Sequence, residues 1–183
     1  MNSSINDQAA AVSKKSNVYA WYVVLLCMLA YIFSFIDRQI LALMIEPIKA
    51  DLNLSDTQFS LLHGLAFSLF YAFMGLPLAY LADRFSRPKI IAVGIVFWSI
   101  ATAICGLSKS FIQLFFSRMG VGVGEAALSP AAYSMFSDMF SKDKLGRAVA
   151  VYSSGSFVGG GIAFLVGGYV IGSFPSGVVW VKL

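Results

Sequence analysis

The sequence predicts an all-α membrane protein that crosses the bilayer about five times, and three observations carry this prediction. Hydrophobic residues make up 58% of the 183-residue chain, and charged residues make up only 12%. The mean hydropathy is +0.79, so the composition is that of a membrane protein and not of a soluble domain. The apolar residues are gathered in long runs, and about 20 such residues suffice to cross a bilayer as a helix.

The order of these runs divides the chain into a tail, a helical bundle and a short end segment. Residues 1–18 are polar and predict a cytoplasmic N-terminal tail, residues 19–173 hold the bundle, and residues 174–183 are too few to span. Ser-x-x-Gln capping boxes mark the starts of the second and fourth helices. The predicted helices cover residues 20–45, 56–82, 89–107, 111–137 and 147–173.

Basic residues set the predicted orientation, because the cytoplasmic loops of membrane proteins carry an excess of Lys and Arg. With five helices in this order, only Lys49 and Lys109 fall in the loops of the opposite side. The N-terminus is therefore predicted to lie in the cytoplasm. The basic residues on its side are Lys14, Lys15, Arg84, Arg87, Lys89, Lys142, Lys144 and Arg147.

The most informative stretch is LFFSRMGVGVGEAA, residues 114–127, because it carries two charges inside an apolar run. Arg118 and Glu125 are seven residues apart, nearly two helical turns, so both side chains point the same way. Charges at this depth usually face a partner or a water-filled cavity. In one interpretation the two charges neutralise each other in a packed interface. In the other, which we favour, this helix lines a polar cavity.

Small residues and a proline shape two of the predicted helices, 111–137 and 147–173. Glycines in membrane helices let a neighbouring helix approach closely. Pro130 is expected to kink the first of these helices and to leave the carbonyl of Ala126 without its usual donor. The glycines with a predicted packing role are Gly120, Gly122, Gly124, Gly155 and Gly159.

Two further charges interrupt the first helix. Asp37 and Arg38 lie about 25 Å from its start at 1.5 Å per residue, and the fourth helix, running the opposite way, is expected to bring Arg118 to a similar depth. Asp37 with Arg118, and Arg38 with Glu125 or a substrate, are therefore predicted partners across helices. Alternatively, Asp37 and Arg38 are interfacial and hydrated. His63, the single histidine, is interpreted as an interfacial polar residue, with titration near neutral pH as the alternative.

The sequence does not indicate an enzyme, a cofactor or a nucleic-acid partner. It contains no phosphate-binding loop, no metal-ligand cluster and no catalytic Ser/Cys–His arrangement. Cys27 and Cys105 both lie in apolar runs without metal-ligand spacing. The formal charge of +4 resides mostly in the loops, which favours membrane anchoring over nucleic-acid binding.

Two motifs resemble those of the major facilitator superfamily of transporters. The turn near residue 84 resembles the superfamily pattern G-x-L-a-D-R-x-G-R-R/K, with departures at Ala79, Ser86 and Pro88. The fourth helix resembles L-x-x-x-R-x-x-Q-G-x-G, with Val121 in place of glutamine. The fifth helix lacks the Gly-Pro pair of the drug/proton antiporters. The matching residues are Leu81, Ala82, Asp83, Arg84, Arg87, Lys89, Leu114, Arg118, Gly122 and Gly124.

Within the superfamily, two stretches are similar to the spinster-like transporters. They are FSFIDRQILALMIEPIKADLNLSDTQFSLLHGLAFSLFYAFMGLPLAYLADRFSRPKII and RMGVGVGEAALSPAAYSMFSDMF, the second with a glutamate after its glycine run. The resemblance covers most of residues 19–171. It implies a fold of two six-helix halves with substrate bound between them near the bilayer midplane. The chain would then be a partial N-terminal bundle, truncated before the sixth helix, with residues 174–183 out of the family register.

The resemblance also implies roles for individual residues. Asp37 and Glu125 would couple transport to protons, while Arg38, Arg118 and Glu125 would line the substrate cavity. Transport would need the missing C-terminal half or a second copy of the chain. The residues of the cytoplasmic gate would be Asp83, Arg84, Arg87, Lys89, Asp138 and Arg147.

The expected function is proton-coupled secondary transport of a small organic or lipid-like solute. The expected location is the plasma membrane, which is the inner membrane in a bacterium. One alternative is an organic anion/proton symporter of the same superfamily. The other is a five-span membrane protein that binds other helices and moves no solute.

Overall fold

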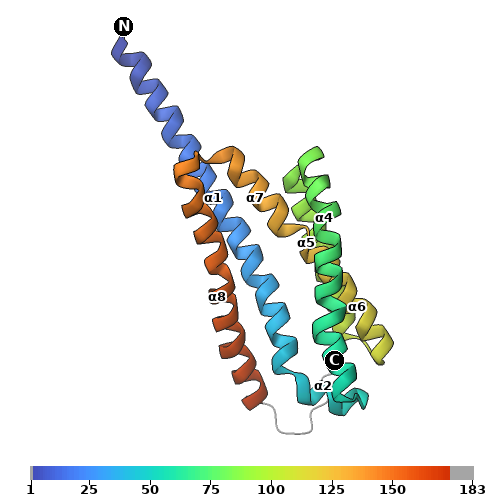
Figure 1. The fold of residues 1–183 in the computed structure, drawn as a ribbon. Helices are drawn as coiled ribbons and strands as arrows, with labels where there is room; N and C mark the ends of the chain where they lie inside the picture. The colour runs from blue at the N-terminus through green and yellow to red at the C-terminus, as the bar shows by residue number, and fades with distance from the viewer. Residues whose placement is uncertain (1, 174–183) are drawn as a thin grey trace.

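The structure is a computed structural model that describes residues 2–173, and every regular element in this range is a helix (Figure 1). The predicted all-α class is therefore confirmed. The α3, η1 and α4 elements follow one another without a gap and form one long span. The helices are α1 (Asn2–Leu43), α2 (Ile45–Leu52), α3 (Asp56–Ser60), η1 (Leu61–Ala66), α4 (Phe67–Arg84), α5 (Arg87–Gly106), α6 (Phe111–Glu125), α7 (Leu128–Met139) and α8 (Lys142–Ser173).

Four helical segments are long and apolar enough to cross a membrane. Large apolar side chains on them point away from the protein, as expected of surfaces that face lipid: Leu76 is 80% exposed and Phe157 is 83% exposed. These segments and the chain's apolar composition indicate an integral membrane protein. The four segments are Asn17–Leu43, Asp56–Arg84, Arg87–Gly106 and Lys142–Tyr169.

The first helix is longer than predicted, because α1 begins at Asn2 and includes most of the predicted tail. No glycine or proline occurs before Pro47, so nothing in the sequence interrupts a helix there. At its other end α1 stops at Leu43 instead of residue 45, and α2 starts after a turn at Met44. Pro47 is the third residue of α2, within the first turn, where a missing N–H costs nothing.

The second span begins as predicted and then departs from a regular α-helix. Ser55 and Gln58 form the predicted capping box. The five-residue α3 is followed by the π-helical turn η1, which the sequence analysis did not predict. Pro77 lies inside α4, and the helix continues through it. The second predicted capping box is only half present, because the Gln113 side chain accepts from the N–H of Lys109 and not from that of Ser110.

The fourth predicted helix is divided into α6 and α7. The break falls at Ala126 and Ala127, four and three residues before Pro130. The N–H of Ala127 bonds to the carbonyl of Gly124, three residues back, which tightens the last turn of α6. Pro130 has no N–H to donate to the carbonyl of Ala126, so the predicted interruption has this physical basis.

The loop predicted between Asp138 and Arg147 is much shorter in the structure. α7 ends at Met139, and α8 begins at Lys142 instead of residue 147. The carbonyl of Ser141 accepts the N–H groups of Lys144 and Leu145, which closes the first turn. An aspartate at position 143, in that first turn, also favours a helix start through the helix dipole.

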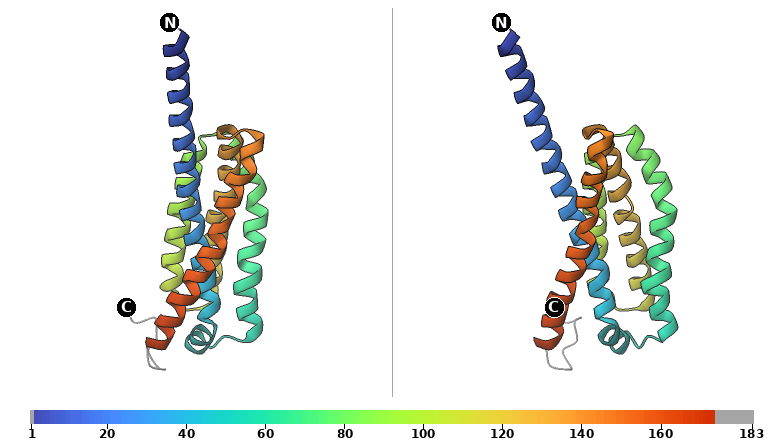
Figure 2. Two further views of the ribbon diagram at one scale, coloured as in Figure 1. Left: turned by 90° about the vertical axis from the view of Figure 1, so that its left-hand side faces the viewer. Right: turned by 60° about the vertical axis from the view of Figure 1, so that its left-hand side comes forward.

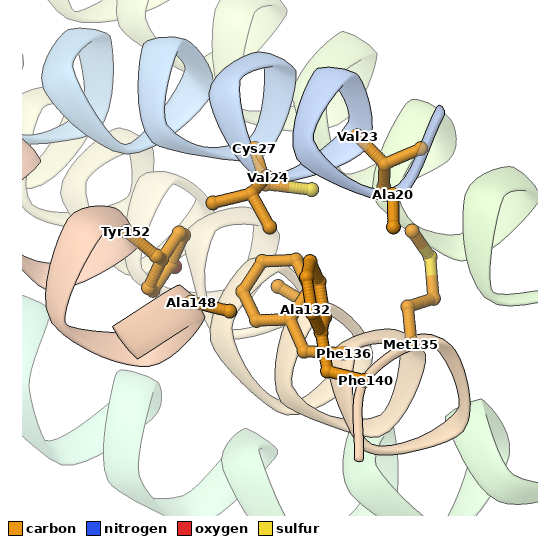
Figure 3. Close-up of a cluster of buried hydrophobic side chains, with 10 residues drawn as sticks. All are labelled: Ala20, Val23, Val24, Cys27, Ala132, Met135, Phe136, Phe140, Ala148 and Tyr152. Carbon is orange, nitrogen blue, oxygen red and sulfur yellow. The ribbon is translucent and has the colours of Figure 1, made fainter. Parts of the chain in front are cut away.

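The most extensive helix–helix packing in the bundle joins α1 and α8, which lie side by side (Figures 1 and 2). Near the α8 N-terminus, α7 joins them around a cluster of buried side chains (Figure 3). Tyr152 and Phe136 are fully buried there, and the Tyr152 hydroxyl forms a hydrogen bond of 2.9 Å with Ser129. α6 packs on α4 and α5. α7 also contacts α4 and α5, so beyond the break the chain adds contacts with α1 and α8 to those with α4 and α5.

Candidate functional site

A buried ion pair joins α1 to the end of α6. The Arg38 guanidinium lies 2.6 Å from Oε2 of Glu125, and its Nε donates to the same oxygen at 2.7 Å. Ser34, one turn earlier on α1, also donates to Oε2, at 2.6 Å, and accepts from Arg38 at 3.3 Å. Glu125 and Ser34 are each 1% exposed. This carboxylate therefore has two donors from one helix and no contact with bulk solvent.

A second ion pair joins the same two helices. Nη1 of Arg118 lies 3.6 Å from Oδ2 of Asp37, and the hydroxyl of Thr102 on α5 donates to that oxygen at 3.0 Å. Arg118 is 3% exposed, and the side chain of Asp37 is 19% exposed. Each carboxylate of the site thus has one arginine as its ion-pair partner and one hydroxyl as a hydrogen-bond donor.

The two pairs answer one question left open by the sequence, whether Arg118 and Glu125 neutralise each other. The predicted partnerships of Asp37 with Arg118 and of Arg38 with Glu125 are both present. Among the described residues, Arg118 and Glu125 do not pair with each other along α6. The side chains of Arg38 and Asp37 are 23% and 19% exposed, so both are partly buried between helices. All four charges lie together between α1 and α6.

Aromatic rings surround the arginines. The guanidinium carbon of Arg38 lies 4.5 Å from the ring centre of Phe67 and 4.8 Å from that of Tyr71, both on α4. The guanidinium carbon of Arg118 lies 5.4 Å from the same Phe67 ring. Distances below about 6 Å allow a cation–π attraction, which is stronger away from water.

Four of these residues were not predicted from the sequence: Ser34, Thr102, Phe67 and Tyr71. Ser34 could have been found, because it lies four residues before Arg38 and therefore on the same helix face. Thr102 and Phe67 carry no such signal, since they reach the charges from other helices. Their contacts depend on how α4 and α5 are placed beside α1.

Two buried polar atoms of the site have no hydrogen-bond partner among the described residues. They are Oε1 of Glu125 and Nε of Arg118. Buried polar groups without a partner are rare and each calls for an explanation. The site thus retains one acceptor and one donor for additional hydrogen bonds.

A groove of about 530 Å³ lies between α1 and α5 and reaches this site. Its lining is mostly apolar, and Asp37 and Thr102 supply polar groups to it. The other lining residues are Leu26, Leu29, Ala30, Phe33, Ile95, Trp98 and Ser99.

The glycines with a predicted packing role all lie against neighbouring helices. A Cβ at Gly122 would lie 2.7 Å from the backbone oxygen of Phe67, and one at Gly124 would lie 2.8 Å from Trp98. A Cβ at Gly120 would lie 3.3 Å from the Cβ of Ala101. On α8, a Cβ at Gly155 or Gly159 would lie 3.1 Å from Met28 or 2.8 Å from Ile32, respectively. α4, α5 and α1 can therefore approach more closely than side chains would allow.

The predicted gate residues lie at the end of the bundle that holds the α4–α5 turn. Arg87 forms an ion pair with Asp138 of α7. Asp83 accepts a hydrogen bond of 3.4 Å from Ser134, also on α7. Arg84 lies 4.4 Å from the ring centre of Tyr80 on its own helix. Lys89 and Arg147 are exposed and, within residues 2–173, form no ion pair.

The remaining polar candidates lie apart from the site. His63 is exposed and stacks on Phe59 with 6.2 Å between ring centres. Near the same end, Lys49 lies 2.5 Å from Asp56 and 3.7 Å from Glu46, and the hydrogen bond to Asp56 raises the pKa of Lys49. No group of three or more His, Cys, Asp or Glu residues that could hold a metal ion occurs in the part of the chain described.

Comparison with known proteins gives the same family from sequence and from structure. The model of the Major Facilitator Superfamily matches residues 27–181. An MFS-type efflux pump of Mycolicibacterium smegmatis is 33% identical over 150 residues, which cover 78% of this chain and 35% of that protein. Protein spinster homolog 1 of Xenopus tropicalis is 33% identical over 156 residues, covering 83% of this chain and 30% of that protein.

A crystal structure shows the same arrangement of helices. It is that of a bacterial homolog to the human lysosomal transporter Spinster, inward-facing and unoccupied. It matches with a TM-score of 0.78 and 39% identity, over 90% of this chain and 38% of the other. The chain thus spans about a third of the length of these relatives. These relatives are transporters and not enzymes, and the chain belongs to the Major Facilitator Superfamily, with spinster homologues among its relatives.

Proposed function

We propose that this chain forms part of a proton-coupled secondary transporter for a small organic or lipid-like solute. The observation that carries the proposal is the pair of buried carboxylate–arginine contacts between α1 and α6. Ionisable groups within a membrane are costly and commonly mark a substrate or proton pathway. In this proposal, Asp37 and Glu125 exchange protons, while Arg38 and Arg118 bind the solute.

The coupling follows from competition for the arginines. While Arg118 lies beside Asp37, its positive charge favours the ionised carboxylate. A negatively charged group of a solute that binds Arg118 would take this neighbour away from Asp37. The buried carboxylate would then take up a proton, so that solute and proton move together. The same exchange applies to Arg38 and Glu125.

The surroundings of the charges support a solute with two kinds of surface. Two guanidinium groups favour an anionic group, and the unpartnered Nε of Arg118 offers one further donor. The apolar groove that reaches Asp37 favours a hydrocarbon portion beside that group. An organic anion without an apolar portion is the second candidate, and it would use the arginines alone.

The two ends of the bundle have different proposed roles. The contact between Arg87 and Asp138 would hold the inner gate together with Asp83, Arg84, Lys89 and Arg147. The excess of Lys and Arg at this end supports a cytoplasmic location, with the N-terminus inside and the protein in the plasma membrane or a bacterial inner membrane. Alternating access needs one half of a transporter to move against another. We therefore propose that transport requires a C-terminal half or a second copy.

Uptake driven by a pH gradient tests this function. The chain is reconstituted in liposomes, alone and with a co-expressed C-terminal half of a spinster-like relative, and is offered organic anions and single-chain lipids. Proton-driven uptake should fall at least tenfold in Asp37→Asn and Glu125→Gln, and Glu46→Gln on α2 is the matched control. Uptake unchanged by both variants would refute proton coupling. A stable complex with a non-transporter protein, without uptake, would favour the membrane interaction protein instead.

A further inference from the structure

The two arginines of the site share one aromatic neighbour. The ring of Phe67 lies 4.5 Å from the guanidinium carbon of Arg38 and 5.4 Å from that of Arg118. Within the described chain it is the only ring over Arg118, whereas Arg38 also contacts Tyr71 and Phe35. Phe67 is 7% exposed and packs against Val121, which lies between the two charges of α6.

The backbone of Phe67 is held close to α6. A Cβ at Gly122 would lie 2.7 Å from the carbonyl oxygen of Phe67, so no other residue type fits there without a shift. The close contact between the Phe67 backbone and Gly122 of α6 places the Phe67 ring beside both arginines. The position of the ring is thus set by helix packing and not by the flexible side chains around it.

The four charges admit a second pairing. Asp37 and Arg38 are neighbours in the sequence, and Arg118 and Glu125 lie two turns apart on one helix. This second pairing would join Arg38 to Asp37 and Arg118 to Glu125. In the structure, each arginine nevertheless holds one carboxylate, and the shared aromatic ring contacts both guanidinium groups.

We propose that Phe67 is a positioning residue that assigns Arg38 to Glu125 and Arg118 to Asp37. Its negative ring face attracts each guanidinium and fixes the direction from which that group reaches its carboxylate. The inference deepens the proposed transport site, because two separate pairs can release their arginines independently. Without the ring, the charges would form one cluster in which both arginines respond to both carboxylates.

Arginine side-chain NMR tests the assignment without any transport assay. The chain is labelled with ¹⁵N-arginine, and the signals of Arg38 and Arg118 are assigned by Lys substitution. In the native chain, Glu125→Gln should shift the Nε–Hε signal of Arg38 and leave that of Arg118 in place. Asp37→Asn should do the reverse. In Phe67→Leu, each carboxylate substitution should shift both arginine signals.

An aromatic substitution separates positioning from simple packing. Phe67→Tyr keeps the ring and should restore the one-to-one response, while Phe67→Met fills a similar volume and should fail as Phe67→Leu does. The proposal would be overturned if each carboxylate substitution still shifted only one arginine signal in Phe67→Leu and Phe67→Met. It would also be overturned if this one-to-one response were lost in Phe67→Tyr.

A further measurement uses the native chain and requires no substitution at position 67. Ring current from Phe67 should move the Hε signal of Arg118 upfield of that of exposed Arg147. Absence of this shift would also overturn the proposal, even if Leu and Met prevent folding. The NMR experiment contains no solute, so its result does not depend on whether the chain takes part in transport. Failure of the transport proposal and failure of the Phe67 proposal can therefore be distinguished.

Discussion

Arg38 and Glu125 lie 87 residues apart in the sequence, yet Nε of the arginine donates to Oε2 of the glutamate at 2.7 Å. The Glu125 side chain is fully buried, whereas that of Arg38 is 23% exposed. Removing the arginine therefore strands a buried charge, while removing the glutamate leaves a cation with some access to solvent and with aromatic neighbours. The two partners should differ in what their loss costs.

This asymmetry can be measured. Arg38→Gln should lower the free energy of unfolding by about 3–5 kcal/mol, the cost of leaving one member of a buried pair alone. Glu125→Gln should cost less, and the double variant should recover part of the arginine loss. Unfolding in mixed detergent micelles, followed by circular dichroism, gives the three values. Equal costs for both single variants would contradict the asymmetry.

Ser34 should stabilise the fold through Glu125. Its hydroxyl is buried and donates to the carboxylate at 2.6 Å, and hydrogen bonds to charged groups contribute about 1.5–3 kcal/mol. Ser34→Ala should lower the free energy of unfolding by that amount. Ser156→Ala is the matched control, because that hydroxyl bonds only to the carbonyl of Ser153. In Glu125→Gln, where the acceptor is neutral, the effect of Ser34→Ala should shrink.

Gly122 on α6 should not tolerate a methyl group. In Gly122→Ala, the added Cβ would lie 2.7 Å from the backbone oxygen of Phe67, and such overpacking costs about 1–3 kcal/mol. Gly160→Ala on α8 meets nothing within 4 Å and should gain up to about 1 kcal/mol from helix propensity. Thermal unfolding in detergent should therefore show a lower midpoint for Gly122→Ala and a higher midpoint for Gly160→Ala. A neutral Gly122→Ala would show that α4 and α6 are separable at this contact.

The ion pair between Arg87 and Asp138 should contribute little to stability. The side chain of Asp138 is 60% exposed, and exposed pairs contribute about 0–1 kcal/mol. Asp138→Asn should therefore shift the unfolding midpoint slightly, and 1 M salt should remove the difference from the native chain. Asp51→Asn on α2 serves as a control, because the exposed Asp51 side chain forms no ion pair within the described residues. A large effect that survives salt would mean that the pair is buried in the assembled protein.

Cysteine labelling should settle the orientation. In a Cys27→Ser and Cys105→Ser background, Asp51→Cys on α2 should react with a membrane-impermeant maleimide added to intact cells. Lys144→Cys at the start of α8 should react only after the membrane is opened. α2 and the start of α8 lie at opposite ends of the bundle (Figure 1). The reverse pattern would place the N-terminus outside and contradict the positive-inside argument.

The sequence could predict both ion pairs because depth in a membrane can be counted along a helix. Charges at similar depths within an apolar bundle must find each other or water, which limits the choice of partners to a few. Phe67 and Thr102 could not be found this way, since uncharged residues are abundant in membrane helices. Their roles depend on the rotation of α4 and α5, which no local pattern encodes.

Element ends were predicted less well, for identifiable reasons. The polar residues at the start of α1 suggested a tail, but polarity does not break a helix when glycine and proline are absent. Charged residues near Lys142 suggested a loop, although a charged first turn is also a common helix start. The interruption near Pro130 was predictable because proline removes one specific donor.

The π-turn η1 changes the direction in which side chains before and after it point from the second span. Leu62 packs against Leu114, and Phe67 packs against Val121, so both must face α6. Five residues apart in a regular α-helix, they would point about 140° away from each other at 100° per residue. A π-turn, with hydrogen bonds from residue i to i+5, brings them onto one face. The span thus contains one residue more than a regular helix would need, and deleting a residue between 61 and 66 would turn its N-terminal part away from α6.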